Sequence, residues 1–285
     1  MRFVNFQRFS YTETGVISGE EIISLRDSGL EDIRSVIARG PDGLDAVNGW
    51  VRRPPGGAVA RLSEVKLRAP VLHPRKIVCV GLNYRDHAAE VDLEPPDVPT
   101  IFSKFPTAII GPGEAIVLPR ASNKPDYEAE FAFVISRGGR HIPAERWREH
   151  VFGYTCFNDV TARDFQMATT QWVIGKSFDT FAPMGPWVVT ADEIPDPHSL
   201  DITLTLNGQV MQSSNTSLLI FGIPELIEHL SSVFTLEPGD VVATGTAAGV
   251  GVARKPPRFL RPGDEVVVSI QGIGELRNPV VAEAV

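Results

Sequence analysis

The chain has 285 residues and a formal net charge of −8, with 43% hydrophobic and 22% charged residues. This acidic balance argues against a nucleic-acid binder, which would present a basic field. The N-terminal stretch MRFVNFQRFSY is too polar for a signal peptide, and no apolar run approaches the ~20 residues of a membrane helix. A cytoplasmic protein that contacts no membrane is therefore expected.

Residues 1–70 are expected to form a small N-terminal α/β domain. The stretches FVNFQRF and TGVISGEEIISL predict two short strands. LEDIRSVIA has apolar residues at helical spacing and predicts a helix that Gly40 closes. GPDG and RRPPGG are typical of turns or a linker. Nothing in this part of the sequence indicates chemistry.

Residues 71–285 are expected to form a second, larger domain that is rich in strands. PAERWREHVFG and IPELIEHLSSVF predict helices, and Asn207-Gly208 in LNGQVMQ predicts a hairpin turn. This β-rich α+β pattern differs from regular βαβ alternation. The predicted strands are the runs KIVCVG, TAIIGPG, AIVLP, EFAFVIS, PWVVT, DITLTLNG, DVVATG and DEVVVSI.

The stretch KPDYEAEFAFVI places two carboxylates, Glu128 and Glu130, on the same face of an expected strand. One interpretation is the solvated face of an edge strand. The other adds Asp159, which follows the apolar run VFGYTCF, to give an oxygen site of charge −3. Because neighbouring carboxylates repel and are costly to bury alone, such a site would suit a hard divalent cation.

Two further stretches carry candidate catalytic residues. CVGLNYRDHAAE places His87 and Glu90 three residues apart, on one face of a helical turn. A carboxylate beside an imidazole suits a general base, although a surface pair would have the same spacing. Lys176 lies in the apolar segment QWVIGKSFDTFAPMGPW, so we expect it to be partly buried and to need a partner, such as an oxyanion beside a metal.

Several common sites are excluded by the sequence. The GKS at Lys176 is no phosphate loop, because Thr170 stands where that motif needs glycine. The Gly-rich TGTAAGVG is followed by the proline-containing ARKPPRF, which opposes the helix that a dinucleotide site needs. Cys79 and Cys156 have no metal-binding spacing and are expected to be buried, reduced thiols.

Taken together, these stretches resemble the fumarylacetoacetate hydrolase family in its small bacterial type, which includes acylpyruvases and 2-hydroxyhepta-2,4-diene-1,7-dioate isomerases. Each motif alone is unspecific, but eight of them in register are highly specific. The match runs in order from about Val71 to Val281, through VGLNYRDHAAE, PTIFSKFPTAIIGPGEAI, DYEAEFAFVI, GYTCFNDVTARDFQ, GKSFDTFAPMGPW, LNGQVMQ, LEPGDVVATGTAAGVG and LRPGDEVVVSIQGIGELRNPV.

The resemblance implies a mixed β-sandwich roll that holds Mg²⁺ or Mn²⁺ and usually forms a homodimer. It also implies three groups of site residues. These are the metal ligands Glu128, Glu130 and Asp159; the catalytic residues His87, Glu90 and Lys176; and the substrate contacts Arg163, Gln166 and Thr246. His87 and Glu90 would lie on a segment that folds as a lid over the metal.

The function implied by the resemblance is metal-dependent hydrolysis of a C–C bond. The substrate would be a small anionic 2,4-dioxo acid (an acylpyruvate, fumarylpyruvate or a diketo sugar acid), which would yield a pyruvate-type product and a carboxylic acid. Alternatives on the same metal–enolate centre are a 2-oxo acid isomerase or tautomerase and an oxaloacetate decarboxylase. A sugar-acid dehydratase and a non-catalytic binding protein stay open as further alternatives.

Overall fold

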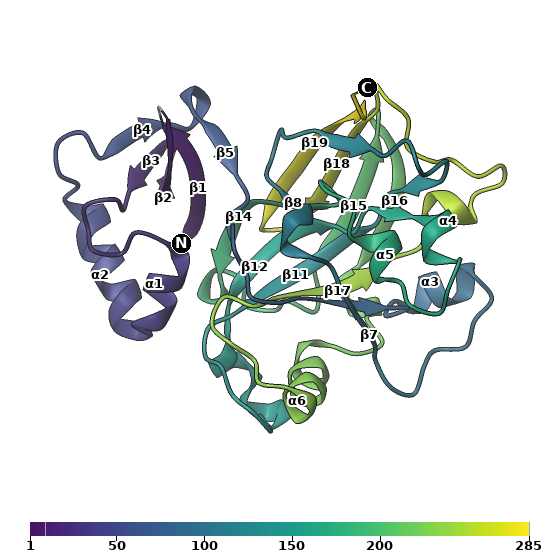
Figure 1. Ribbon diagram of the computed structural model, residues 1–285. Helices are drawn as coiled ribbons and strands as arrows, with labels where there is room; N and C mark the ends of the chain where they lie inside the picture. Colours follow the sequence, from purple (N-terminus) through teal and green to yellow (C-terminus); the bar gives the residue numbers. More distant parts are fainter. Residues whose placement is uncertain (9, 285) are drawn as a thin grey trace.

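The N-terminal part of the chain folds into a small sheet with two helices on one side (Figure 1). The computed structural model describes residues 1–8 and 10–284. Phe9, the last residue of the predicted first strand, lies outside the described residues. The elements of this N-terminal unit are β1 (Arg2–Arg8), β2 (Tyr11–Ser18), β3 (Glu21–Ser24), α1 (Ile33–Ala38), α2 (Pro41–Arg52), β4 (Val59–Arg61) and β5 (Lys66–Arg68).

Two of the predictions for this unit are wrong. TGVISGEEIISL is not one strand but parts of β2 and β3, which pair as a hairpin around Gly19 at φ +63°. GPDG is not a turn, because α2 begins there. Pro41 is the first helical residue, where its missing N–H costs nothing, and the Asp42 carboxylate favours the first turn.

Helix α2 provides a matched pair of substitutions that test its packing. Gly49→Ala should raise the free energy of unfolding by about 0.5–1 kcal/mol, because Gly49 has no φ restriction and a Cβ there meets nothing within 4 Å. Gly43→Ala in the same helix should lower it, since the new Cβ would lie 2.2 Å from the Val36 carbonyl oxygen. Urea unfolding of both variants measures the difference, and equal effects would contradict this packing.

The larger part of the chain continues the same sheet. β1 pairs antiparallel with β14, so the main sheet runs in the order β4-β3-β2-β1-β14-β12-β11-β17-β6-β7. β5 pairs with β1, and β8 pairs with β14. The strands added here are β6 (Ile77–Gly81), β7 (Thr100–Ser103), β8 (Ile109–Ile110), β11 (Ala129–Ile135), β12 (Val151–Asn158), β14 (Ala182–Thr190) and β17 (Val241–Thr246).

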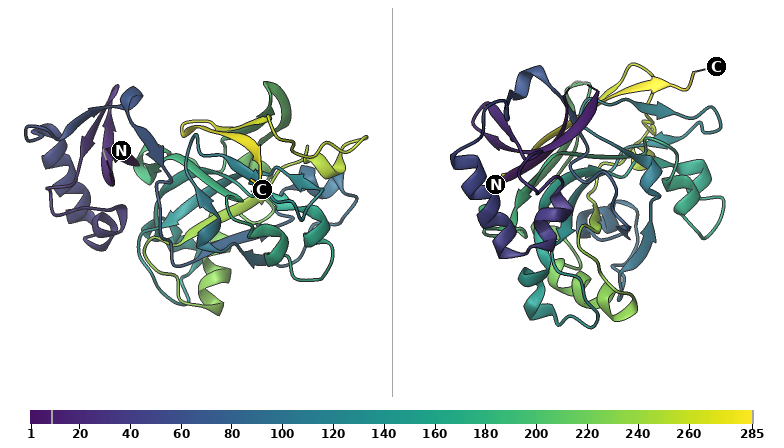
Figure 2. Two further views of the ribbon diagram at one scale, coloured as in Figure 1. Left: turned by 45° about the horizontal axis from the view of Figure 1, so that its top comes forward. Right: turned by 60° about the vertical axis from the view of Figure 1, so that its left-hand side comes forward.

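A second sheet packs against this one to complete a strand-rich α+β fold, as predicted (Figure 2). Its order is β16-β15-β18-β19-β9, and its strands β15, β18 and β19 lie against β11, β12 and β14. The strands outside the main sheet are β9 (Ile116–Leu118), β10 (Pro125–Asp126), β13 (Thr161–Ala162), β15 (Asp201–Leu206), β16 (Gln209–Asn215), β18 (Glu265–Ile270) and β19 (Gly274–Ala282).

The remaining helices are short, and one predicted helix is absent from the described chain. IPELIEHLSSVF forms α6 (Ile223–Val233), and Asn207-Gly208 makes the hairpin turn with both residues at positive φ, so both predictions are confirmed. PAERWREHVFG is not an α-helix. Its first part is a 3₁₀ turn over Ala144–His150, and its end enters the fully buried strand β12, where sheet pairing prevails over the helical pattern.

Candidate active site and metal centre

Strand β11 lies in the middle of the main sheet and brings its acidic residues into the interior. The predicted alternation holds, since Phe131 and Phe133 face one core cluster while Ala132 and Val134 face another. The edge-strand interpretation is wrong, because β12 and β17 pair with β11 on its two sides. Glu130 is 1% exposed, so its carboxylate is buried rather than solvated.

The structure brings together the three carboxylates that the sequence singled out. Glu128 precedes β11, Glu130 lies in it, and Asp159 follows the neighbouring strand β12. One oxygen from each of the three side chains lies within 4.8 Å of the others. The backbone N–H of Asp159 donates to the Glu128 carbonyl at 2.9 Å, so the ends of the two strands are fixed relative to each other.

Three buried cations surround these carboxylates. Lys176, at the end of α5 (Val173–Lys176), donates at 2.6 Å both to Glu128 and to Asp159. Arg163, at the start of α4 (Arg163–Gln166), places Nη2 2.7 Å from Glu128 Oε1. Lys104 lies 2.5 Å from Asp159 Oδ1. The expectation that Lys176 is buried and partnered is confirmed, and its partners are the candidate metal ligands themselves.

The charges affect the carboxylates unequally. Burial, together with the negative charges of Asp159 and Glu128, raises the pKa of Glu130 well above its usual range. Burial acts in the same direction on Glu128, but there the charges of Arg163 and Lys176 outweigh it and lower the pKa to about 2. No ion pair joins Glu130 to a Lys or Arg among the described residues. Of the three carboxylates, Glu130 is therefore the one whose negative charge is not balanced by an adjacent cation.

This donor set fits a hard divalent cation. Carboxylate oxygens are the ligands that Mg²⁺ and Mn²⁺ prefer, and three buried carboxylates converge here. A cation bound between Glu128, Glu130 and Asp159 would balance the negative charge of Glu130, which has no Lys or Arg partner among the described residues. The neighbouring Cys79 contributes no thiolate, because burial and then the Asp159 charge raise the pKa of its thiol.

Three residues that sequence reasoning missed hold this centre in place. Asp126 is fully buried and accepts from Arg163 Nε at 2.8 Å and from the Gly251 N–H at 2.8 Å. Lys104 also donates to the Val160 carbonyl. Gln212 accepts from the Ala129 N–H and donates to Thr246 Oγ1, each at 2.8 Å. Lys104 and Asp126 are charged residues inside the matched motifs, and this position is the sequence feature that could have indicated a role at the site.

The predicted His87–Glu90 pair is formed on the short helix α3 (Arg85–Glu90). His87 Nδ1 lies 3.0 Å from Glu90 Oε2, and because a carboxylate only accepts, Nδ1 carries the proton. In the neutral imidazole, Nε2 then carries the lone pair. The other Glu90 oxygen accepts from the Gly249 N–H at 2.8 Å, which ties α3 to the Gly-rich loop after β17.

A pocket of about 630 Å³ connects this pair with the carboxylates. His87, Glu128, Glu130, Lys176 and the three predicted substrate contacts all line it. All three of those contacts also bond within the protein. The Thr246 hydroxyl donates to the Ala129 carbonyl, and Gln166 Oε1 accepts from Arg163 Nη1. Of the nine predicted residues, seven therefore line one pocket, and Glu90 and Asp159 bond directly to lining residues.

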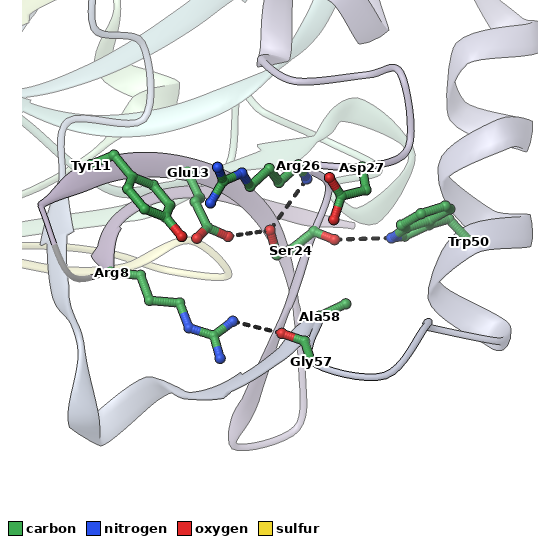
Figure 3. A pocket seen from close by; sticks show the side chains of 9 residues that line it. All are labelled: Arg8, Tyr11, Glu13, Ser24, Arg26, Asp27, Trp50, Gly57 and Ala58. Atoms are coloured by element: carbon green, nitrogen blue, oxygen red, sulfur yellow. Dashed lines mark hydrogen bonds between the residues drawn. The ribbon is translucent and has the colours of Figure 1, made fainter.

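A second pocket, of about 420 Å³, lies in the N-terminal unit (Figure 3). Ser24 sits at its centre, where its hydroxyl donates to Glu13 and its carbonyl accepts from Trp50 Nε1 at 2.9 Å. The Arg26 guanidinium lies 4.0 Å from the centre of the Tyr11 ring. These contacts tie β2, β3 and α2 together, which is a structural role for the pocket.

Comparison with known proteins agrees with this geometry. The model of the family described as "Fumarylacetoacetate (FAA) hydrolase C-terminal" matches residues 76–281. The chain is 51% identical over 221 residues to oxaloacetate tautomerase FAHD2A, mitochondrial, from Bos taurus, which covers 77% of this chain and 70% of that protein. No helix among the described residues is long and apolar enough to cross a membrane.

Two solved structures are similar over the whole chain. A putative HpcE protein from Mycobacterium smegmatis superposes with a TM-score of 0.88 at 37% identity and 100% coverage of both chains. Maleylpyruvate hydrolase from Sphingobium sp. SYK-6, solved with manganese(II) and pyruvate, has a TM-score of 0.84 at 32% identity, again with 100% coverage of both. The chain therefore belongs to the fumarylacetoacetate hydrolase family.

Proposed function

We propose that the chain is a divalent-metal-dependent enzyme that interconverts the keto and enol forms of a small anionic 2-oxo acid of the oxaloacetate type. The observation that carries this proposal is the polarised pair His87–Glu90 on the wall of the pocket that also holds Glu128 and Glu130. A base beside a cluster of carboxylates that fits a metal suits proton transfer next to a carbonyl. The 51% identity to an oxaloacetate tautomerase supports the same activity.

Each residue of the pocket has a separate role in this proposal. Mg²⁺ or Mn²⁺, held by Glu128, Glu130 and Asp159, would supply Lewis-acid polarisation of the 2-oxo group. His87 Nε2 takes a proton from the substrate carbon next to that group and delivers it to the enolate oxygen to give the enol, and the reverse transfers give back the keto form, while Glu90 stabilises the imidazolium. Lys176 stays cationic, because the charges of Asp159 and Glu128 outweigh burial and raise its pKa, so it favours the enolate oxygen.

Hydrolysis of a 2,4-dioxo acid is the second candidate. The sequence interpretation put this reaction first, and the same residues support it, since His87 can take a proton from water as well as from carbon. The similarity to a maleylpyruvate hydrolase supports hydrolysis, but its sequence identity of 32% is lower than the 51% identity to the oxaloacetate tautomerase. Decarboxylation of oxaloacetate uses the same enolate.

The homodimer and the cytoplasmic location predicted from the sequence stay predictions.

The test is to add the purified chain to the enol of oxaloacetate and to record the enol absorbance over time. The measurement is made separately with Mn²⁺, with Mg²⁺ and with a chelator. Metal-dependent acceleration of the loss of enol absorbance is the expected result. Mass spectrometry of products from acetylpyruvate, fumarylpyruvate, a 2,4-dioxo sugar acid and oxaloacetate separates the alternatives. Pyruvate plus a second acid would make hydrolysis the main activity, and carbon dioxide from oxaloacetate alone would make it decarboxylation. No turnover with metal bound would leave a binding protein.

A further inference from the structure

The active pocket changes in character from its floor to its outer wall. The floor is charged and contains Glu128, Glu130, Arg163 and Lys176. The outer wall is mainly apolar, with Thr169 as a polar member, and is assembled from three separate parts of the chain, which lie near α3, between α4 and α5, and after β17. The apolar side chains that these parts contribute are Val91, Leu93, Met167, Trp172, Val250 and Val252.

The cations of the floor are already engaged by the protein. Arg163 directs Nε to Asp126 at 2.8 Å, Nη2 to Glu128 at 2.7 Å and Nη1 to Gln166 at 3.0 Å. Lys176 bonds two carboxylates and is 2% exposed. No further Lys or Arg is found among the described residues that line this pocket. A negative group at the far end of a long substrate would therefore meet no positive partner.

The wall is partly fixed and partly exposed. The Trp172 ring packs edge-on against Phe102, with ring centres 5.4 Å apart. It also lies so close to Gly81 that a Cβ there would be 2.3 Å from the indole, so only glycine leaves room for the ring. Leu93 is 56% exposed and Met167 68%, so both side chains present apolar surface at the mouth that a ligand can cover.

We infer that this wall is a subsite for an uncharged, apolar end group of the 2-oxo acid, so that longer substrates bind through an alkyl or aryl end and not through a second carboxylate. This inference rests on the proposed function. The subsite is inferred for acids longer than the four carbons of oxaloacetate. Beyond that length, each buried methylene should tighten binding about fourfold, whereas a carboxylate would lose its hydration.

Equilibrium binding of simple 2-oxo acids tests the subsite independently of the reaction that is catalysed. Calorimetry on the full chain with Mn²⁺ would compare pyruvate, 2-oxohexanoate and 2-oxoadipate, of which the last two have equal length and differ in their end group. We expect 2-oxohexanoate to bind at least about tenfold more tightly than 2-oxoadipate. Met167→Lys should reduce or invert this ratio by adding a cation to the wall. Val233→Lys, at a 65% exposed position on α6, is the matched control and should leave it unchanged.

The outcomes separate the two proposals. If pyruvate binds but 2-oxoadipate binds as tightly as 2-oxohexanoate, the apolar subsite is wrong and the proposed function stands. An unchanged ratio in Met167→Lys, with folding confirmed by circular dichroism, would equally overturn the subsite. If none of the three acids binds the manganese-loaded protein, the proposed function fails, and the subsite fails with it.

Discussion

Glu130→Gln should abolish metal binding and turnover together. Glu130 is the candidate ligand that no described cation neutralises, so its charge is the one that a divalent cation would compensate. We expect Mn²⁺ affinity to fall at least about 100-fold and kcat/KM at least about 1,000-fold, which corresponds to roughly 4 kcal/mol of lost transition-state stabilisation. Calorimetric titration with Mn²⁺ and the oxaloacetate assay measure the two losses.

The same variant should be more stable than the wild type when metal is absent. The neutral amide removes the repulsion between Glu130 and the neighbouring charges of Asp159 and Glu128. With saturating Mn²⁺ the order should reverse, because only the wild type gains from binding, by about 2.7 kcal/mol at 100 times the Kd. Thermal unfolding with chelator and with Mn²⁺ tests this, with the exposed Glu145→Gln as control. Normal metal affinity and turnover in Glu130→Gln would remove Glu130 from the ligand set.

His87→Ala should separate catalysis from metal binding. His87 lies on α3, carries its proton on Nδ1 toward Glu90 and contributes no carboxylate to the metal site. Removing a general base costs about 10²–10⁴ in rate, so we expect kcat to fall in that range. Mn²⁺ affinity should stay within about threefold of the wild type, since all three carboxylates are intact.

Two further variants sharpen this result. His73→Ala, at an exposed position, controls for loss of an imidazole and should keep full activity. Glu90→Gln should lower kcat less than His87→Ala and shift its pH dependence, because the neutral amide no longer stabilises the imidazolium. If His87→Ala turns over oxaloacetate near the wild-type rate, another group is the base.

The sequence predicts which candidate site residues lie together better than it predicts the residues that support them. Period-two alternation places Glu128 and Glu130 on one face, and helical spacing brings His87 to Glu90, so both pairs follow from local geometry. Lys104 and Asp126 contact Asp159 and Arg163 across 55 and 37 residues of sequence. No local pattern carries such contacts, and their roles became visible only in the fold.

The fold itself shows the same limit. Buried strands such as β11 are recognisable from their apolar runs. The order in which the strands pair cannot be predicted from the sequence of any single strand. PAERWREHVFG has a helical pattern, yet its last residues are needed as a strand between β11 and β14. The start of α2 at Gly40-Pro41 has the residue types of a turn, because glycine and proline are common both in turns and at the first positions of helices.

The pairing of β1 with β14 gives the N-terminal unit a protective role. β14 is joined on one side to β12, and its other side meets β1 at Val188 and Val189 and β8 at Ala182 and Pro183. Without β1, apolar residues and unpaired backbone groups of β14 would form an open sheet edge, which is a template for self-association. We therefore expect the N-terminal unit to shield the main sheet from aggregation, and removal of β1 to reduce solubility before it affects the candidate active site.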